Sequence, residues 1–215
     1  MNKILCIYPK DSTTEFLRPI YNTICAKPNA IGIELNTVED DSFLEKVSRN
    51  LENATIVFFL GHGSSTCLYG TNLNPLIEED MGNVEELQNK SLILFACKSA
   101  DFIKKYNFQN SLGFGFIPTS LDDARDGMLH NLNLKCLDSS SLDALQQTIV
   151  RIWKRTLKEV SLDQLATLSK VLSFYTNYEI VHILLHCKDF QNYRILADIQ
   201  YYLKEDMRYF PIKNY

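Results

Sequence analysis

Two short apolar runs constrain most strongly what this chain can fold into. The segments TIVFFL (55–60) and SLILFA (91–96) are unbroken runs rich in β-branched, leucine and aromatic side chains. Runs of this length are too short for a helix with an apolar stripe, and they are typical of strands buried on both faces of a parallel sheet. A reactive side chain follows each run closely, His62 after the first and Cys97 after the second.

The rest of the sequence up to residue 135 alternates between strand-like and helix-like segments. We predict further strands at 3–8, as a central strand, and at 30–35 and 111–117. Helices are predicted at 11–26, 41–51, 83–89 and 99–106, and a loop at 66–82. The first helix carries a capping box, Ser12 to Glu15, and Pro19 is expected to kink or restart it. This alternation predicts an α/β fold, a mainly parallel sheet flanked by helices.

From residue 121 onwards the pattern becomes helical. Helices are predicted at 122–131, 141–160, 162–177 and 178–207, and residues 208–215 are predicted to return as an edge strand. A chain of 215 residues can bury one well-filled core. We therefore expect a single domain over 1–215, with a sheet-bearing part at 1–135 and a helical part at 136–215.

The charge of the chain argues against nucleic acid as a partner. It has 22 Lys and Arg against 26 Asp and Glu, a net charge of −4, and no basic cluster. The first residues lack the apolar core of a signal peptide, and no run approaches the ~20 apolar residues of a membrane-spanning helix. We expect a cytoplasmic protein that contacts neither a membrane nor nucleic acid.

The six cysteines are scattered and form no CxxC pair, so neither a disulfide framework nor a zinc site is predicted. Five of them, Cys6, Cys25, Cys67, Cys136 and Cys187, are expected to behave as small hydrophobes. His182 and His186 lie one helical turn apart without the Glu of a zinc peptidase, so an exposed or packed pair is expected there. We expect no metal and no other cofactor.

Cys97 differs from the other cysteines in its position. Side chains just past the carboxyl ends of strands in an open α/β sheet lie in the crevice where ligands bind. We expect Cys97 to be a nucleophile whose thiolate is favoured by a following helix start and by His62 as the base. The amides of Gly63 and Cys97 are expected to stabilise an oxyanion. Since no third orienting residue is evident, we predict a dyad that transfers acyl groups through a thioester.

These motifs resemble a known family. LGHGSS (60–65) and FACKSAD (95–101) are similar to the His-Gly and Cys-x-Ser signatures of caspase-like (clan CD) cysteine peptidases, which include caspases, metacaspases, separases, gingipains and bacterial CHAT domains. The resemblance covers roughly residues 1 to 135. It implies a caspase-like fold with His62 as base, Cys97 as nucleophile, and Gly63 and Cys97 amides in the oxyanion hole. By class it also implies a regulated endopeptidase of bacterial antiviral defence or cell death.

The resemblance extends to substrate preference. The segment SLGFGFIPTSLDDAR (111–125) is similar to the strand that leads into a substrate-pocket loop, and in several relatives an acid there binds a basic side chain. Asp122 and Asp123 match that place, which implies Arg or Lys before the scissile bond. The alternative is that one of these acids caps the following helix. Ala100 and Phe95 depart from the family pattern, where many members have Gly and metacaspases have an acid.

The tyrosine-rich helical part suggests control by a partner, because tyrosine is enriched at interfaces. We expect a protein or peptide substrate and an activating or inhibiting protein partner or small ligand. Two alternatives stay open from the sequence: a catalytically silent scaffold with a caspase-like fold, and a hydrolase of small-molecule amides or acyl groups. The tyrosines concerned are Tyr175, Tyr178, Tyr193, Tyr201, Tyr202, Tyr209 and Tyr215.

Overall fold

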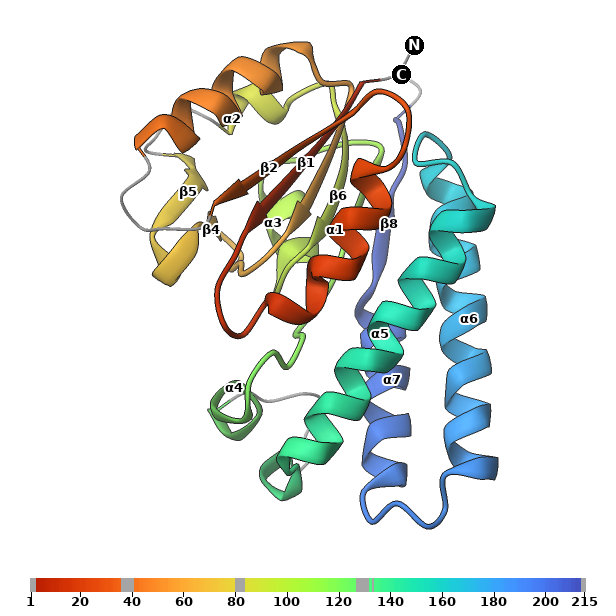
Figure 1. The fold of residues 1–215 in the computed structure, drawn as a ribbon. Coiled ribbons are helices and arrows are strands. Elements are labelled where there is room, and N and C mark those ends of the chain that lie inside the picture. Colours follow the sequence, from red (N-terminus) through yellow and green to blue (C-terminus); the bar gives the residue numbers. More distant parts are fainter. Residues whose placement is uncertain (1–2, 36–40, 80–83, 127–131, 133, 214–215) are drawn as a thin grey trace.

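The strands of the main sheet run in the order β2-β1-β3-β6-β7-β8. A computed structural model describes residues 3–35, 41–79, 84–126, 132 and 134–213 of the chain (Figure 1). The first five strands of that order are parallel, and β8 pairs with β7 in the antiparallel direction. Their bounds are β2 Ala30–Leu35, β1 Ile4–Pro9, β3 Ile56–Leu60, β6 Ser91–Phe95, β7 Ser111–Gly113 and β8 Arg208–Phe210. The predicted α/β fold is confirmed, although β3 and β6 rather than β1 form the middle pair.

Helices cover both faces of this sheet, which explains why β1 and β3 are buried at every position. Helices α1 (Arg18–Cys25) and α5 (Ser139–Glu159) lie on one face, and α2 (Asp41–Asn53) and α3 (Ser99–Lys105) lie on the other (Figure 1). Side chains alternate between the two cores, so that Phe58 packs on the α5 side and Phe59 on the α2 and α3 side.

Among the core side chains that the helical part contributes, Trp153 is the largest. Trp153 of α5 is buried, and its ring lies 5.2 Å from that of Phe58 and 5.4 Å from that of Phe95, between ring centroids. Helices α6 (Leu165–His186) and α7 (Tyr193–Asp206) follow before the chain returns as β8, the predicted edge strand. The predicted helix boundary at 177/178 is wrong, because no helix-breaking residue stands there and the turn falls in the polar segment 187–192.

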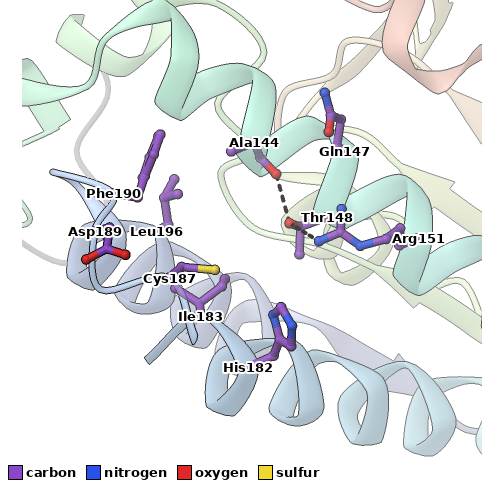
Figure 2. A pocket seen from close by; sticks show the side chains of 10 residues that line it. All are labelled: Ala144, Gln147, Thr148, Arg151, His182, Ile183, Cys187, Asp189, Phe190 and Leu196. Carbon is purple, nitrogen blue, oxygen red and sulfur yellow. Dashed lines mark hydrogen bonds between the residues drawn. The ribbon is translucent and has the colours of Figure 1, made fainter. Parts of the chain in front are cut away.

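A cavity of about 480 Å³ lies between α5 and the turn that joins α6 to α7 (Figure 2). Thr148 Oγ1 bonds to the Ala144 carbonyl at its edge, and Arg151 donates to the same hydroxyl. His182 and Cys187 also line it, and His182 packs beside His186 with ring centroids 5.2 Å apart. None of the residues that follow the strand ends contributes to this cavity.

Several predicted elements differ at the edge of the sheet. The predicted loop at 66–82 contains a two-stranded hairpin, β4 (Cys67–Tyr69) and β5 (Pro75–Glu78). Its turn, η2 (Thr71–Leu73), has positive φ angles at Asn72 and Leu73. Residues 80–82 lie outside the described part. The predicted helix 83–89 is a single 3-10 turn, η4 (Glu85–Leu87). Strand β7 is shorter than predicted because Gly113 ends it.

The remaining short elements border the predicted site. The chain forms a 3-10 turn, η1 (Glu15–Leu17), before α1 begins with Pro19 in its first turn, as the expected restart at proline requires. Helix α4 (Leu121–Asp126) and the turn η5 (Leu134–Cys136) precede α5, and the predicted helix residues 127–131 lie outside the described part. Among the described helices, none combines the length and apolar character needed to cross a membrane.

Close approach of α3 to β7 depends on Gly113, and this can be tested. A Cβ atom at Gly113 would lie 2.6 Å from the backbone nitrogen of Ala100, whereas one at Gly70 would meet nothing closer than 3.4 Å. We expect Gly113→Ala to lower the free energy of unfolding by about 1–3 kcal/mol, because the clash involves backbone atoms. Gly70→Ala is the matched control and should change it little. Urea denaturation of both variants measures the difference, and equal midpoints would contradict the tight contact.

Candidate active site

The pairing of β3 with β6 brings the two predicted catalytic residues to the same edge of the sheet. Leu60 is paired with Phe95 in parallel register, and the Gly61 N–H continues the ladder by donating to the Phe95 carbonyl at 3.3 Å. His62 and Cys97 each follow two residues after this last pair. Because the strands are parallel, both side chains emerge at the carboxyl edge, where open α/β sheets bind ligands.

Gly63 lies directly against the backbone of Cys97. A Cβ atom at this position would be 3.0 Å from the Cys97 carbonyl oxygen and 3.0 Å from the Ala96 Cβ, so a side chain there would fit only if these neighbours shifted by a few tenths of an ångström. Within the described part of the chain, neither the Gly63 N–H nor the Cys97 N–H donates a hydrogen bond to another residue. Two adjacent, uncommitted amides are the donors that an oxyanion requires.

His62 has a carboxylate partner that sequence reasoning missed. Its Nε2 lies 2.9 Å from Asp11 Oδ2 and 2.8 Å from the hydroxyl of Thr13. Asp11 follows β1, the strand beside β3, so it reaches the same edge of the sheet. The sequence signal for Asp11 is an acid just past the end of the predicted strand 3–8. The same residue also begins the predicted helix 11–26, which conceals this signal.

The local fold of residues 11–14 explains how Asp11 is held. Its Oδ1 accepts hydrogen bonds from the backbone N–H of Thr13 at 2.8 Å and of Thr14 at 3.1 Å, which makes a turn in place of the predicted capping box at Ser12. Burial alone would raise the pKa of Asp11, but hydrogen bonds from His62 and Thr13 outweigh it and hold this pKa well below its usual range. Asp11 is therefore a fixed negative charge beside the imidazole at neutral pH.

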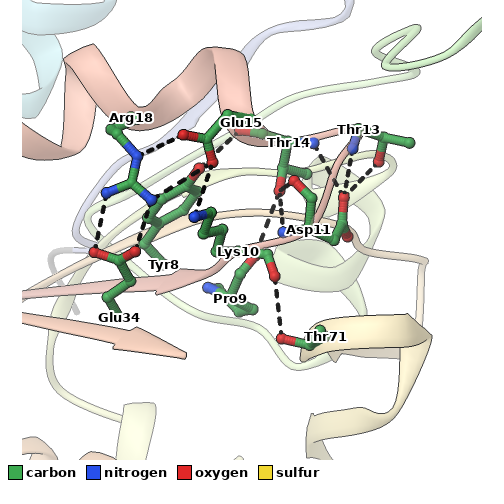
Figure 3. A network of polar contacts seen from close by, with 10 residues as sticks. All are labelled: Tyr8, Pro9, Lys10, Asp11, Thr13, Thr14, Glu15, Arg18, Glu34 and Thr71. Carbon is green, nitrogen blue, oxygen red and sulfur yellow. Dashed lines mark hydrogen bonds and ion pairs between the residues drawn. The ribbon is translucent and has the colours of Figure 1, made fainter. Parts of the chain in front are cut away.

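A polar network clamps this turn onto the sheet (Figure 3). The Tyr8 hydroxyl donates to the Thr14 carbonyl at 3.1 Å, and the Thr71 hydroxyl donates to the Lys10 carbonyl at 3.3 Å. Arg18 bridges Glu15 and Glu34, at 2.6 Å and 2.7 Å, and so ties η1 to β2. Contacts to β1, β2 and the hairpin thus fix the position from which Asp11 meets His62.

The Cys97 thiol is hydrogen-bonded to the backbone of Ile117. Sγ accepts a hydrogen bond from the Ile117 N–H at 3.3 Å and donates to the Ile117 carbonyl at 3.2 Å. Burial raises the pKa of Cys97 to about 11; the Asp123 carboxylate acts in the same direction, and the Ile117 N–H and Lys98 oppose it. In this conformation the pKa of the thiol is therefore shifted in the direction opposite to the one that a base and a helix start predict.

The start of α3 shows why that helix does not favour the thiolate. Its first amides are already engaged: Ser99 N–H donates to the Ala96 carbonyl and Ala100 N–H to the Phe114 carbonyl. Lys98 adopts a left-handed conformation with φ of 54°, and its N–H donates to the Gly115 carbonyl. The buried Ser99 hydroxyl joins β6 to β7 by donating to the Leu94 carbonyl and accepting from the Phe114 N–H. Ser99 thus fixes the turn that carries Cys97.

The two acids predicted to bind substrate have different surroundings. Asp123 Oδ2 accepts hydrogen bonds from the backbone N–H and the hydroxyl of Thr119, and the Asp123 N–H donates to Ser120 Oγ at 3.0 Å. This is the helix-capping alternative, realised at the start of α4. Asp122 is exposed on the same helix. The charge of Asp123 contributes to raising the pKa of Cys97, so the start of α4 lies near the thiol.

The protonated state of Cys97 predicts how its alkylation depends on pH. Because only the thiolate reacts, the rate of iodoacetamide labelling at Cys97 should rise about tenfold per pH unit from pH 7 to 10, and it should be slow at pH 7. Cys136 is exposed and serves as the internal control. Peptide mass spectrometry after timed labelling measures both rates. Labelling of Cys97 that is fast at pH 7 and flat above it would contradict the raised pKa.

Comparisons with protein-family models, curated proteins and solved structures found no match for this chain. The resemblance of its two motifs to caspase-like peptidases therefore stays a prediction. What the chain does has to be inferred from the arrangement of Asp11, His62, Gly63 and Cys97.

Proposed function

We propose that this chain is a caspase-like cysteine endopeptidase that cleaves peptide bonds through a thioester intermediate. The observation that carries the proposal is the register of β3 and β6, which sets His62 and Cys97 at equal distance beyond the paired residues Leu60 and Phe95. A thiol, an imidazole and two uncommitted amides at one strand edge are the groups that acyl transfer needs. Asp11 extends the predicted dyad with an orienting carboxylate.

Each residue then has a defined part in the reaction. His62 takes the thiol proton as Cys97 Sγ attacks the scissile carbonyl carbon, and the Gly63 and Cys97 amides donate to the oxyanion that forms. The C–N bond breaks as His62 gives that proton to the leaving amine, which leaves a thioester on Cys97. A water molecule, deprotonated by His62, hydrolyses the thioester. Asp11 holds Nε2 throughout and stabilises the imidazolium, which leaves Nδ1 as the working nitrogen.

The resting state of the thiol favours a controlled enzyme. The Ile117 backbone occupies both hydrogen-bonding functions of the thiol, so substrate or a regulator has to displace residues near 117 before attack. We propose that a protein partner or a small ligand exerts this control, in bacterial antiviral defence or cell death. The scattered cysteines, which form no CxxC pair, fit the reducing cytoplasm as its site of action.

Two other functions share the same site. A silent interaction scaffold would need no base, yet His62 is fixed by two polar partners in a way that serves proton transfer. A hydrolase of small-molecule amides would use the same four groups in a narrower pocket. The size of the accepted substrate separates this second function from proteolysis, so both peptides and small amides belong in the assay.

Activity in a peptide-library assay is the principal test. We expect cleavage by the wild type to disappear in Cys97→Ala and His62→Ala, because nucleophile and base are lost. Asp11→Asn should lower kcat/KM roughly 10²- to 10⁴-fold by removing the charge beside the imidazole. Asp101→Asn, on the exposed side of α3, is the matched control. Mass spectrometry of the products identifies the cleaved bond.

Two outcomes would contradict the proposal. Cleavage that persists in Cys97→Ala would remove the thiol from the mechanism. Absence of cleavage by wild type towards peptides and small amides, together with Cys97 that stays inert to an acyloxymethyl ketone even at pH 10, would favour the scaffold. Equal activity of Asp11→Asn and Asp101→Asn would exclude Asp11 as the orienting residue.

Substrate preference gives a separate prediction about Asp122 and Asp123. We expect cleavage after Arg or Lys, and Asp122→Asn should raise KM for these substrates several-fold while leaving kcat within about twofold. Asp123→Asn should instead lower the melting temperature, because the carboxylate caps α4. Kinetics on paired Arg and norleucine peptides, with thermal unfolding of each variant, measures both effects. A preference for Asp before the scissile bond would contradict a basic-residue pocket.

A further inference from the structure

Helix α6 is apolar on both sides, although only one side packs against the protein. Its inner side faces α5 and α7 through a regular series of buried residues: Leu165, Leu168, Leu172, Thr176, Glu179 and Ile183. On the outer side, five large apolar residues are between 39% and 63% exposed: Phe174, Tyr178, Val181, Leu184 and Leu185. Helices that are apolar all round are normally buried.

The outer side of α6 forms one continuous surface. Figure 1 shows α6 at the margin of the molecule, with α5 and α7 on its inner side. We call Phe174, Tyr178, Val181 and Leu185 the α6 stripe; Leu184 lies beside it. Single exposed apolar residues are ordinary on proteins, whereas a cluster confined to twelve consecutive residues of one helix is typical of an interaction site.

The spacing of the α6 stripe fits a second copy of the same helix. The intervals between its members are four, three and four residues, the pattern of a helix–helix seam, and they read the same in both directions. An antiparallel copy would place Phe174 against Leu185 of the other chain and Tyr178 against Val181. The same surface of each copy then contacts itself across a two-fold axis, as a symmetric dimer requires.

The charge of this surface also favours a second copy. Between residues 171 and 187 the only Lys, Arg, Asp or Glu is Glu179. It is buried and paired with Arg151 at 3.0 Å and Arg155 at 3.3 Å. The Arg155 guanidinium borders the stripe, 5.3 Å from the Tyr178 ring centroid, but Glu179 already pairs with it. The stripe itself carries no charge, so a second copy brings none that needs compensation.

The exposed area is of the right order for a dimer. Five half-exposed side chains of this size present roughly 500 Å² per copy, so two copies would bury on the order of 1,000 Å² from them alone. Neighbouring exposed residues add to this, including Tyr201 on α7. The total approaches the lower end of the range for specific interfaces.

We propose that the chain forms a two-fold homodimer in which the α6 stripes of two copies pack antiparallel. The proposal is independent of the proposed peptidase activity, because no residue of the stripe lies at the strand edge that carries His62 and Cys97. Dimerisation is therefore tested by mass and not by catalysis.

Light scattering coupled to size exclusion provides the first test. We expect the wild type at tens of micromolar to show twice the chain mass of 24.8 kDa. Val181→Asp and Leu185→Asp should weaken the dimer at least about 100-fold and elute as monomers, since a carboxylate would be buried without a partner. Thr167→Asp, exposed on the same helix outside the stripe, and Ile212→Asp, exposed elsewhere, should remain dimeric. Unchanged circular dichroism shows that the variants fold.

Cysteine cross-linking tests the orientation of the two helices. In a Cys136→Ser background, chains carrying Phe174→Cys and chains carrying Leu185→Cys should form a disulfide on mild oxidation only when the two are mixed. Each variant alone should not cross-link, because identical positions lie about 16 Å apart along antiparallel helices. A wild-type monomer at all concentrations, or capture of another protein by the stripe without dimerisation, would overturn the proposal. Cross-linking of each variant with itself would overturn the antiparallel arrangement.

Discussion

The pairing of β3 with β6 is the interaction on which the candidate site depends. A parallel ladder from Ile56 and Ser91 to Leu60 and Phe95 fixes how far each following residue extends beyond the sheet. A slip of one residue would move His62 by about 3.3 Å relative to Cys97 and turn every side chain of the strand to the other face. Since both faces are packed by helices, burial sets the register strongly. The placement of His62 and Cys97, the proposed base and nucleophile, thus follows from core packing.

Helix α5 links this site to the rest of the molecule. On one side it carries Trp153, which packs against Phe58 and Phe95 behind the strand ends. Near its start, the Gln146 side chain donates to the Thr119 carbonyl at 3.0 Å, two residues after the Ile117 backbone that holds the thiol. Its other side contacts α6. A continuous series of packed groups therefore runs from the proposed dimer helix to Cys97.

The sequence predicted those features that local pattern determines. Unbroken apolar runs identified β3 and β6, and the abrupt change to helical periodicity identified the C-terminal helices. The partnership of Asp11 with His62 was missed because the two residues are 51 positions apart and meet only through the adjacency of β1 and β3. The hairpin at β4 and β5 was missed because its turn relies on positive φ at Asn72 and Leu73, and Leu rarely signals such a turn. The raised pKa of Cys97 depends on burial and on Ile117, and neither is visible in the residues around the thiol.

The magnitudes at Cys97 indicate what activation of the proposed enzyme requires. Lowering a thiol pKa from about 11 to neutral pH corresponds to roughly 5 kcal/mol of preference for the thiolate. An ion pair between thiolate and imidazolium at about 4 Å provides approximately 4 kcal/mol at the effective dielectric constant of a protein surface. An ion pair with His62 in place of the Ile117 contacts would therefore supply about the free energy that the thiolate needs. Asp11 keeps His62 in position to carry the positive charge. Activation then requires the segment around Ile117 to be displaced and does not require the sheet to be rebuilt, so the register of β3 and β6 serves the dormant and the reactive states alike.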